Sequence, residues 1–98
     1  MTTAQFADYG RCSLNVSDLK IVNNQRVKKF RFQGESYWGQ QPEDCLLILL
    51  SGELTVHYVD RQHRLTPGEL FPLHRLHYYR LISGSGAELV SLEKQEAV

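Results

Sequence analysis

The sequence predicts an all-β protein, an antiparallel jelly-roll barrel of about eight short strands. Stretches rich in β-branched and aromatic residues recur at close spacing, with turn residues between them, which is typical of barrels and sandwiches. Little of the chain has the period of a helix. One apolar run, Leu46–Leu50, changes at Ser51-Gly52 to alternating apolar residues from Leu54 onward. This change is expected of a strand that bends around a small barrel.

The N-terminal part is expected to form an arm and a hairpin. Residues 1–15 are polar and small, and they predict an N-terminal arm or an edge strand. The short stretch Leu19–Val22 leads into Asn23-Asn24, and asparagine tolerates the left-handed backbone of a tight hairpin. The strand Arg26–Phe32 alternates in character, so its two phenylalanines are expected to point inward and its basic side chains to face solvent.

Turn residues divide the remainder of the chain. The segment Cys45–Phe71 predicts two paired strands, a turn and a third strand entered through Pro67-Gly68. Leu76–Ile82 is predicted to be another strand, Ser83–Gly86 a flexible hairpin turn, and Ala87–Leu92 the closing strand.

Length and composition limit the function classes. The 98 residues suit a single domain, 1–98, with its barrel over residues 26–94. Eleven basic and 11 acidic residues give no net charge, so neither nucleic acid nor a membrane surface is an expected partner. No apolar run reaches the ~20 residues of a membrane span, and the first residues lack the features of a signal peptide. Cys12 and Cys45 are expected to be free thiols, and a cytoplasmic location is expected.

Two short motifs point to a known family. SGEL at Ser51–Leu54 and PGELF at Pro67–Phe71 recur in the cupin superfamily, whose members are RmlC-like double-stranded β-helices. The chain resembles a small single-domain cupin over residues 26–94. The resemblance implies a barrel with an internal pocket and, in its usual form, a metal site. It does not imply a particular substrate.

The metal motif is degenerate in this chain. Gly34 and Gly52 look like the two glycines of the first cupin motif. Counted back from Gly52, the ligand positions fall on other residue types: Cys45 for the glutamate, Gln40 or Gln41 for the second histidine, and Trp38 or Gly39 for the first. Counted forward from Gly34, the histidine positions fall on Gln40 and Pro42 instead. In the second motif, Pro72 is in place and His77 keeps the spacing of the family's histidine. A single imidazole does not hold a metal tightly, so no metal and no cofactor are expected.

The sequence gives even less support for a catalytic site than for the usual metal site. A divalent metal held by His77, Cys45 and Gln40 stays open as an alternative, because thiolate and imidazole both suit Zn or Fe. Nucleophilic catalysis by Cys45 is disfavoured, because a thiol beside the apolar run Leu46–Leu50 is expected to be buried, with a raised pKa, and inert. The sequence predicts no catalytic residue and favours a protein that is not an enzyme.

Aromatic and polar side chains near the strands predict a ligand site. Small barrels often keep a cavity for one ligand, and aromatic walls with a few amides and imidazoles can hold a planar or sugar-like molecule. The predicted ligand-binding residues are Trp38, Gln40, Tyr58, His77 and Tyr79.

The sequence therefore predicts a small-molecule-binding or regulatory cupin-like protein without a standard metal site. It is expected to form a homodimer through an edge strand or the N-terminal arm. One alternative is a metal-dependent cupin enzyme (an isomerase, lyase or oxygenase) with an unusual ligand set around His77. Another is a structural or interaction module whose barrel is filled with side chains.

Two further resemblances are less complete. FRFQGESYWGQQPEDCLLILLSGEL looks like the front half of a cyclic-nucleotide-binding domain, but no Gly-Glu pair follows Phe71 to cradle a phosphate. PGELFPLHRLHYYR resembles the ligand-binding arm of arabinose-type transcription regulators, but no helix-turn-helix follows it.

Overall fold

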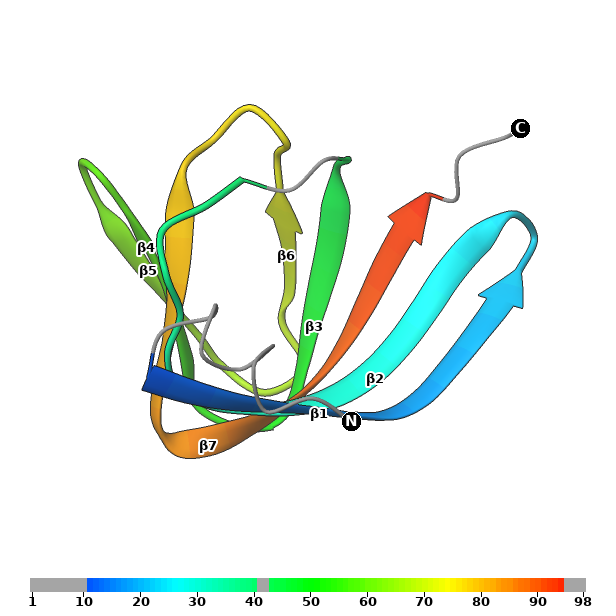
Figure 1. The fold of residues 1–98 in the computed structure, drawn as a ribbon, viewed down its shortest axis with the longest axis horizontal. Helices are drawn as coiled ribbons and strands as arrows, with labels where there is room; N and C mark the ends of the chain where they lie inside the picture. The colour runs from blue at the N-terminus through cyan, green and yellow to red at the C-terminus, as the bar shows by residue number, and fades with distance from the viewer. Residues whose placement is uncertain (1–10, 41–42, 95–98) are drawn as a thin grey trace.

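The computed structural model describes residues 11–40 and 43–94, which form an antiparallel all-β barrel (Figure 1). Its strands are β1 (Arg11–Val22), β2 (Gln25–Glu35), β3 (Cys45–Gly52), β4 (Leu54–Tyr58), β5 (Gln62–Leu65), β6 (Leu70–Leu73) and β7 (Tyr79–Lys94). The predicted fold class is confirmed, with seven strands in place of about eight. The described residues contain no helix, and so none that could cross a bilayer.

The strands follow the order β1-β2-β7-β3-β6, and β4 pairs with both β7 and β5. The first part of β7 pairs with β4, from Tyr58↔Tyr79 to Thr55↔Ile82. Its second part runs between β2 and β3. Figure 1 shows β7 turning sharply between these two parts. The long, bent β7 therefore joins the two walls of the barrel.

The predictions around β7 were wrong in two respects. Ser83–Gly86 is not a hairpin turn but the bend within one strand. Ser83 is buried there, and its hydroxyl donates to the Glu53 carbonyl and accepts from the Gly86 amide. These two hydrogen bonds stabilise the bend. The strand predicted from Leu76 begins only at Tyr79, because the preceding residues form a turn in which the His77 amide donates to the His74 carbonyl.

The glycine that ends β3 is required by a close backbone approach. Gly52 has φ +89°, and a Cβ there would lie 2.2 Å from the Gly86 carbonyl oxygen. The Glu53 amide donates to that same oxygen. The chain can pass from β3 to β4 at this point because Gly52 carries no side chain, which agrees with the bend predicted at Ser51-Gly52.

The N-terminal hairpin follows the prediction. Asn23 and Asn24 have φ of 50° and 66°, the left-handed conformation of a tight two-residue turn between β1 and β2. β1 is an edge strand, because its one partner among the described strands is β2. The predicted arm or edge strand at residues 1–15 is thus a strand from Arg11 on, and residues 1–10 lie outside the described part.

The core lies on the concave side of the sheets. Its members are apolar: Phe30, Phe32, Cys45, Leu47, Leu49, Leu54, Val56, Tyr58, Leu65, Leu73, Ala87 and Leu89. Both phenylalanines of β2 point inward as predicted. In β3, alternate residues from Cys45 are buried, whereas Leu46 and Ile48 are half-buried and Leu50 is exposed. β3 is therefore covered fully on one face and partly on the other.

Candidate ligand-binding site

The barrel is not filled by its side chains. It encloses a cavity of about 340 Å³ that opens to solvent. The lining comes from β1, β2, β3, β6 and β7 and from the segment after β2: Cys12, Leu14, Lys28, Phe30, Phe32, Ser36, Tyr37, Trp38, Gly39, Gln40, Cys45, Leu47, Leu73, Tyr79, Leu81, Ser91 and Glu93. A cavity of this size meets the ~300 Å³ lower limit typical of small-molecule sites.

Strand register explains which side chains reach the cavity. Residues directly opposite in neighbouring strands point to the same face of a sheet. Phe30 of β2 lies opposite Leu89 of β7 in the core. Two residues along each strand, Lys28 lies opposite Ser91. On its other side, Ser91 lies opposite Leu47 of β3. The core face of the sheet therefore continues directly into the cavity wall.

A short segment after β2 forms part of the wall. The Ser36 amide donates to the Leu81 carbonyl, and the Leu81 amide donates back to the Ser36 hydroxyl. Gly39 and Tyr79 exchange two backbone hydrogen bonds. The Gln40 side-chain amide donates to the Leu76 carbonyl at 3.2 Å. These bonds hold the segment against the start of β7.

Trp38 is braced from outside the cavity. Its ring lies 5.2 Å from the His57 ring, and the Arg80 guanidinium lies 5.2 Å from the Trp38 ring centroid. The Arg80 Nε–H donates to His57 Nδ1, so this His57 nitrogen carries no proton in this arrangement. Arg80 also pairs with Glu35 at 3.5 Å. His57 and Arg80 thus hold the tryptophan at the cavity wall, and Glu35 holds Arg80.

Tyr79 and Cys12 supply two protonated groups to the lining. Burial raises the pKa of Tyr79 far above its ordinary value, and the neighbouring Cys45 and Glu93 add to the effect. Its hydroxyl is therefore a hydrogen-bond donor throughout the neutral range. Burial also raises the pKa of the Cys12 thiol, which makes it a poor nucleophile.

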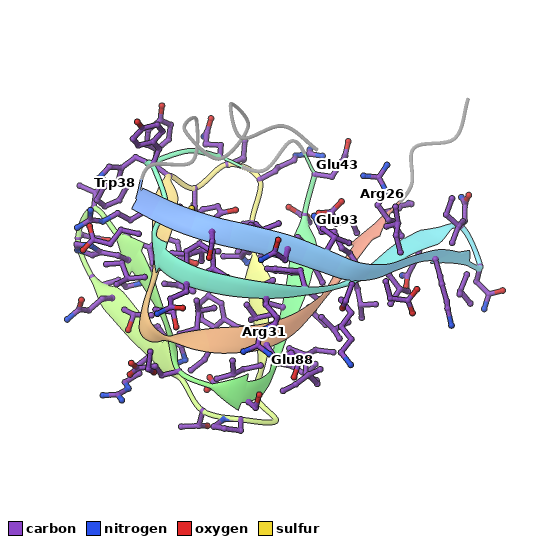
Figure 2. The ribbon with its side chains drawn as sticks, turned by 60° about the horizontal axis from the view of Figure 1, so that its bottom comes forward. Arg26, Arg31, Trp38, Glu43, Glu88 and Glu93 are labelled. Atoms are coloured by element: carbon purple, nitrogen blue, oxygen red, sulfur yellow. The ribbon has the colours of Figure 1, made fainter. Side chains whose placement is uncertain are left out.

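Two lining groups carry charge, Lys28 and Glu93. Glu93 pairs with Arg26 at 3.4 Å, and Figure 2 shows these two side chains beside each other, with Trp38 labelled toward the left of the view. The Lys28 ammonium lies 5.4 Å from the centroid of the Phe30 ring. Within the described residues no acidic group pairs with Lys28.

Ser91 differs from the other polar residues of the cavity. It is 2% exposed, and within the described part of the chain its hydroxyl has no hydrogen-bond partner. Leaving a buried hydroxyl unsatisfied costs about 1–3 kcal/mol. Buried polar groups are nearly always paired in native proteins, so this one requires an explanation.

The cavity brings together three of the five predicted site residues. Trp38, Gln40 and Tyr79 line it. Tyr58 and His77 do not belong to the lining and contact each other instead, with ring centroids 5.9 Å apart. Tyr58 is buried in the core, whereas His77 is exposed on the loop before β7. Binding by these two residues stays a prediction.

The residues that the structure describes do not fit a metal. In the described ranges 11–40 and 43–94, no three His, Cys, Asp or Glu side chains converge as a metal site requires. Of the alternative set, Cys45 and Gln40 line the cavity and His77 does not. Gln41, which shared a ligand position with Gln40, lies outside the described residues. No metal step is therefore derived for this protein.

The sequence interpretation missed Lys28, Ser91 and Glu93. The basic residues of Arg26–Phe32 were expected to face solvent. The alternation that places Phe30 inward also places Lys28 on the inward face, and this signal was present in the sequence. Ser91 and Glu93 carried no comparable signal, because their position depends on the register of β7 with β2 and β3.

The arrangement of strands matches solved structures. A cupin-2 domain protein from Shewanella frigidimarina superposes with a TM-score of 0.73 at 16% identity, covering 94% of this chain and 90% of that one. A cupin superfamily protein from Desulfitobacterium hafniense gives 0.69 at 12%, covering 90% and 81%. The EutQ protein of Clostridium difficile gives 0.76 at 11%, covering 92% and 78%.

This chain has the cupin fold. No family model matches the sequence, and no curated protein matches it. At these identities the cupin likeness concerns the fold alone, and the fold does not imply a function. Gly34 and Gly52, which resemble the two glycines of the first cupin motif, both have positive φ, of 109° and 89°.

Proposed function

We propose that this cupin-fold protein binds a small organic molecule in its barrel cavity, as a binding or regulatory protein without a standard metal site. The observation that carries the proposal is the open cavity of about 340 Å³. A barrel filled by its own side chains would have favoured the alternative of a structural or interaction module. The cavity instead offers room for one small ligand.

The chemistry of the walls supports the proposal. Leu14, Phe30, Phe32, Leu47 and Leu81 supply an apolar surface that would bury the body of a ligand. Trp38 and Tyr79 add aromatic faces and hydrogen-bond donors. A few polar groups placed on mainly apolar walls are the usual composition of a small-molecule site.

The test is a ¹⁹F NMR titration with 4-fluorobenzyl alcohol, a neutral single-ring probe. The wild type is expected to broaden and shift the probe signal in a saturable manner. Leu14→Trp fills the cavity from β1 and is expected to abolish the effect. Leu50→Trp makes the same change at an exposed leucine outside the lining and serves as the matched control. Equal binding by Leu14→Trp and the wild type would contradict binding in the cavity.

We also propose that the protein is a homodimer joined through β1. Leu19 and Ile21 of this edge strand are 57% and 62% exposed. Antiparallel pairing of two copies about Leu19 would place Leu19 opposite its own copy and Asp18 opposite Lys20 of the partner subunit, both on the regular side of the bulge between Val16 and Asp18. Such pairing joins opposite charges, covers apolar side chains and satisfies the edge of β1 that no other described strand pairs with.

A charge exchange tests this pairing. Sedimentation is expected to give a dimer for the wild type and a monomer for Asp18→Lys, which would place like charges opposite each other. The double variant Asp18→Lys with Lys20→Asp is expected to restore the dimer. A wild type that sediments as a monomer, or a double variant that stays monomeric while the wild type is dimeric, would contradict the proposed pairing.

A further inference from the structure

Two polar side chains that lack a polar partner among the described residues lie side by side in the cavity wall. Lys28 of β2 and Ser91 of β7 are directly opposite each other in the strand register, and both line the cavity. Opposed residues of antiparallel strands have Cβ atoms about 4.5–5.5 Å apart. One ligand group can therefore contact both side chains.

Ser91 supplies a donor without a partner. Its side chain is almost fully buried, and nothing in the described part of the protein hydrogen-bonds to its hydroxyl. The matched case is Ser83 on the same strand, which is equally buried and has two hydrogen bonds. The difference leaves the Ser91 hydroxyl as an unused hydrogen-bond donor in the wall of the cavity.

Lys28 supplies an available positive charge. Its neighbours on β2 have acidic partners, because Arg26 pairs with Glu93 and Lys29 with Glu88. Lys28 has no such partner among the described residues, and its ammonium lies against the Phe30 ring in the apolar wall. The other charge on the lining, Glu93, is largely offset by Arg26.

We infer that the ligand class is a small apolar carboxylic acid, an inference that rests on the proposed binding in the cavity. The ligand carboxylate accepts hydrogen bonds from the Lys28 ammonium and the Ser91 hydroxyl. Its apolar body lies against Phe30, Phe32 and Leu47. Hydrogen bonds that involve ions are about twice as strong as those between neutral groups, so the acid is preferred over a neutral molecule of the same shape.

The experiment compares 4-fluorobenzoate with 4-fluorobenzyl alcohol at neutral pH by ¹⁹F NMR titration. The wild type is expected to bind the acid at least about ten-fold more tightly than the alcohol, consistent with an added charge-assisted hydrogen bond. Lys28→Gln is expected to remove this preference, and Lys28→Arg to keep it. Ser91→Ala is expected to weaken binding of the acid several-fold. Lys29→Gln, on the opposite face of β2, is the matched control and is expected to behave as the wild type.

The outcomes separate this inference from the proposed function. If the alcohol binds and the acid binds no more tightly, the carboxylate site is wrong and binding in the cavity stands. If neither probe binds, both are overturned. A preference that persists in Lys28→Gln, in a variant whose amide spectrum shows it folded, would place the carboxylate elsewhere and overturn the inference.

Discussion

Replacing Gly52 by alanine tests the point where β3 passes to β4. The new Cβ would lie 2.2 Å from the Gly86 carbonyl oxygen, so the backbone would have to move by more than an ångström to reach an ordinary contact. A non-glycine residue in a strained conformation costs about 1–3 kcal/mol, and overpacking adds typically 1–3 kcal/mol. The two costs add to about 2–6 kcal/mol, and we expect Gly52→Ala to lower the free energy of unfolding by about 4 kcal/mol.

Gly68→Ala is the matched control. Gly68 has nearly the same φ, +90°, but nothing lies within 4 Å of its Cβ position. Gly68→Ala should therefore lower the free energy of unfolding by the cost of the backbone conformation alone, about 1–2 kcal/mol, with no clash. The gain from restricting the unfolded chain is common to both variants and cancels in the comparison.

The assay is urea unfolding, followed by the fluorescence of Trp38, the single tryptophan, and by circular dichroism. The free energies come from linear extrapolation. A loss for Gly52→Ala that is no larger than the loss for Gly68→Ala would refute the close approach of Gly52 to Gly86.

Three further predictions concern single side chains. Hydrogen bonds from the Thr66 amide and from His63 lower the pKa of Glu69, so the stability it contributes is present at neutral pH and lost as the pH falls through its lowered pKa. Thermal melts should therefore give Glu69→Gln a lower Tm than the wild type at pH 7, and this difference in Tm should shrink in acid. A difference in Tm that stays constant with pH would contradict the lowered pKa of Glu69. Ser83→Ala should lower the free energy of unfolding by about 1–3 kcal/mol, because it leaves the Glu53 carbonyl and the Gly86 amide without their hydrogen-bond partner. Ser91→Ala should leave the free energy of unfolding unchanged or raise it when no ligand is present. Equal losses for the two variants in urea unfolding would contradict the unpaired Ser91 hydroxyl. Asn24→Gly should raise the stability by up to about 1 kcal/mol, because φ of 66° suits glycine; a loss in the same assay would contradict the turn.

Much of the fold could be predicted from local patterns. The asparagine turn, the inward phenylalanines and the bend at Gly52 each depend on residues close in sequence, and all three were confirmed. The turn predicted at Ser83–Gly86 was wrong because its composition suits a hairpin. Its actual role depends on Glu53, which is distant in sequence and accepts a hydrogen bond from Ser83 through its backbone carbonyl.

The candidate site was predictable only in part. Trp38, Gln40 and Tyr79 were predicted from residue type and lie on the cavity wall. Ser91 was not, because nothing local distinguishes it from a serine on a solvent face. Its burial and its lack of a partner follow from the pairing of β7 with strands far away in the sequence.

The most direct test of the central claim is to map bound 4-fluorobenzyl alcohol on the protein by amide chemical-shift changes. Binding in the barrel predicts that the largest changes fall on residues of the cavity wall, such as Leu47, Tyr79 and Ser91, with small changes on the outer faces of the strands. Changes confined to the Tyr58 and His77 region or to the outer faces, or none at saturating probe, would contradict the claim that the cavity is the binding site.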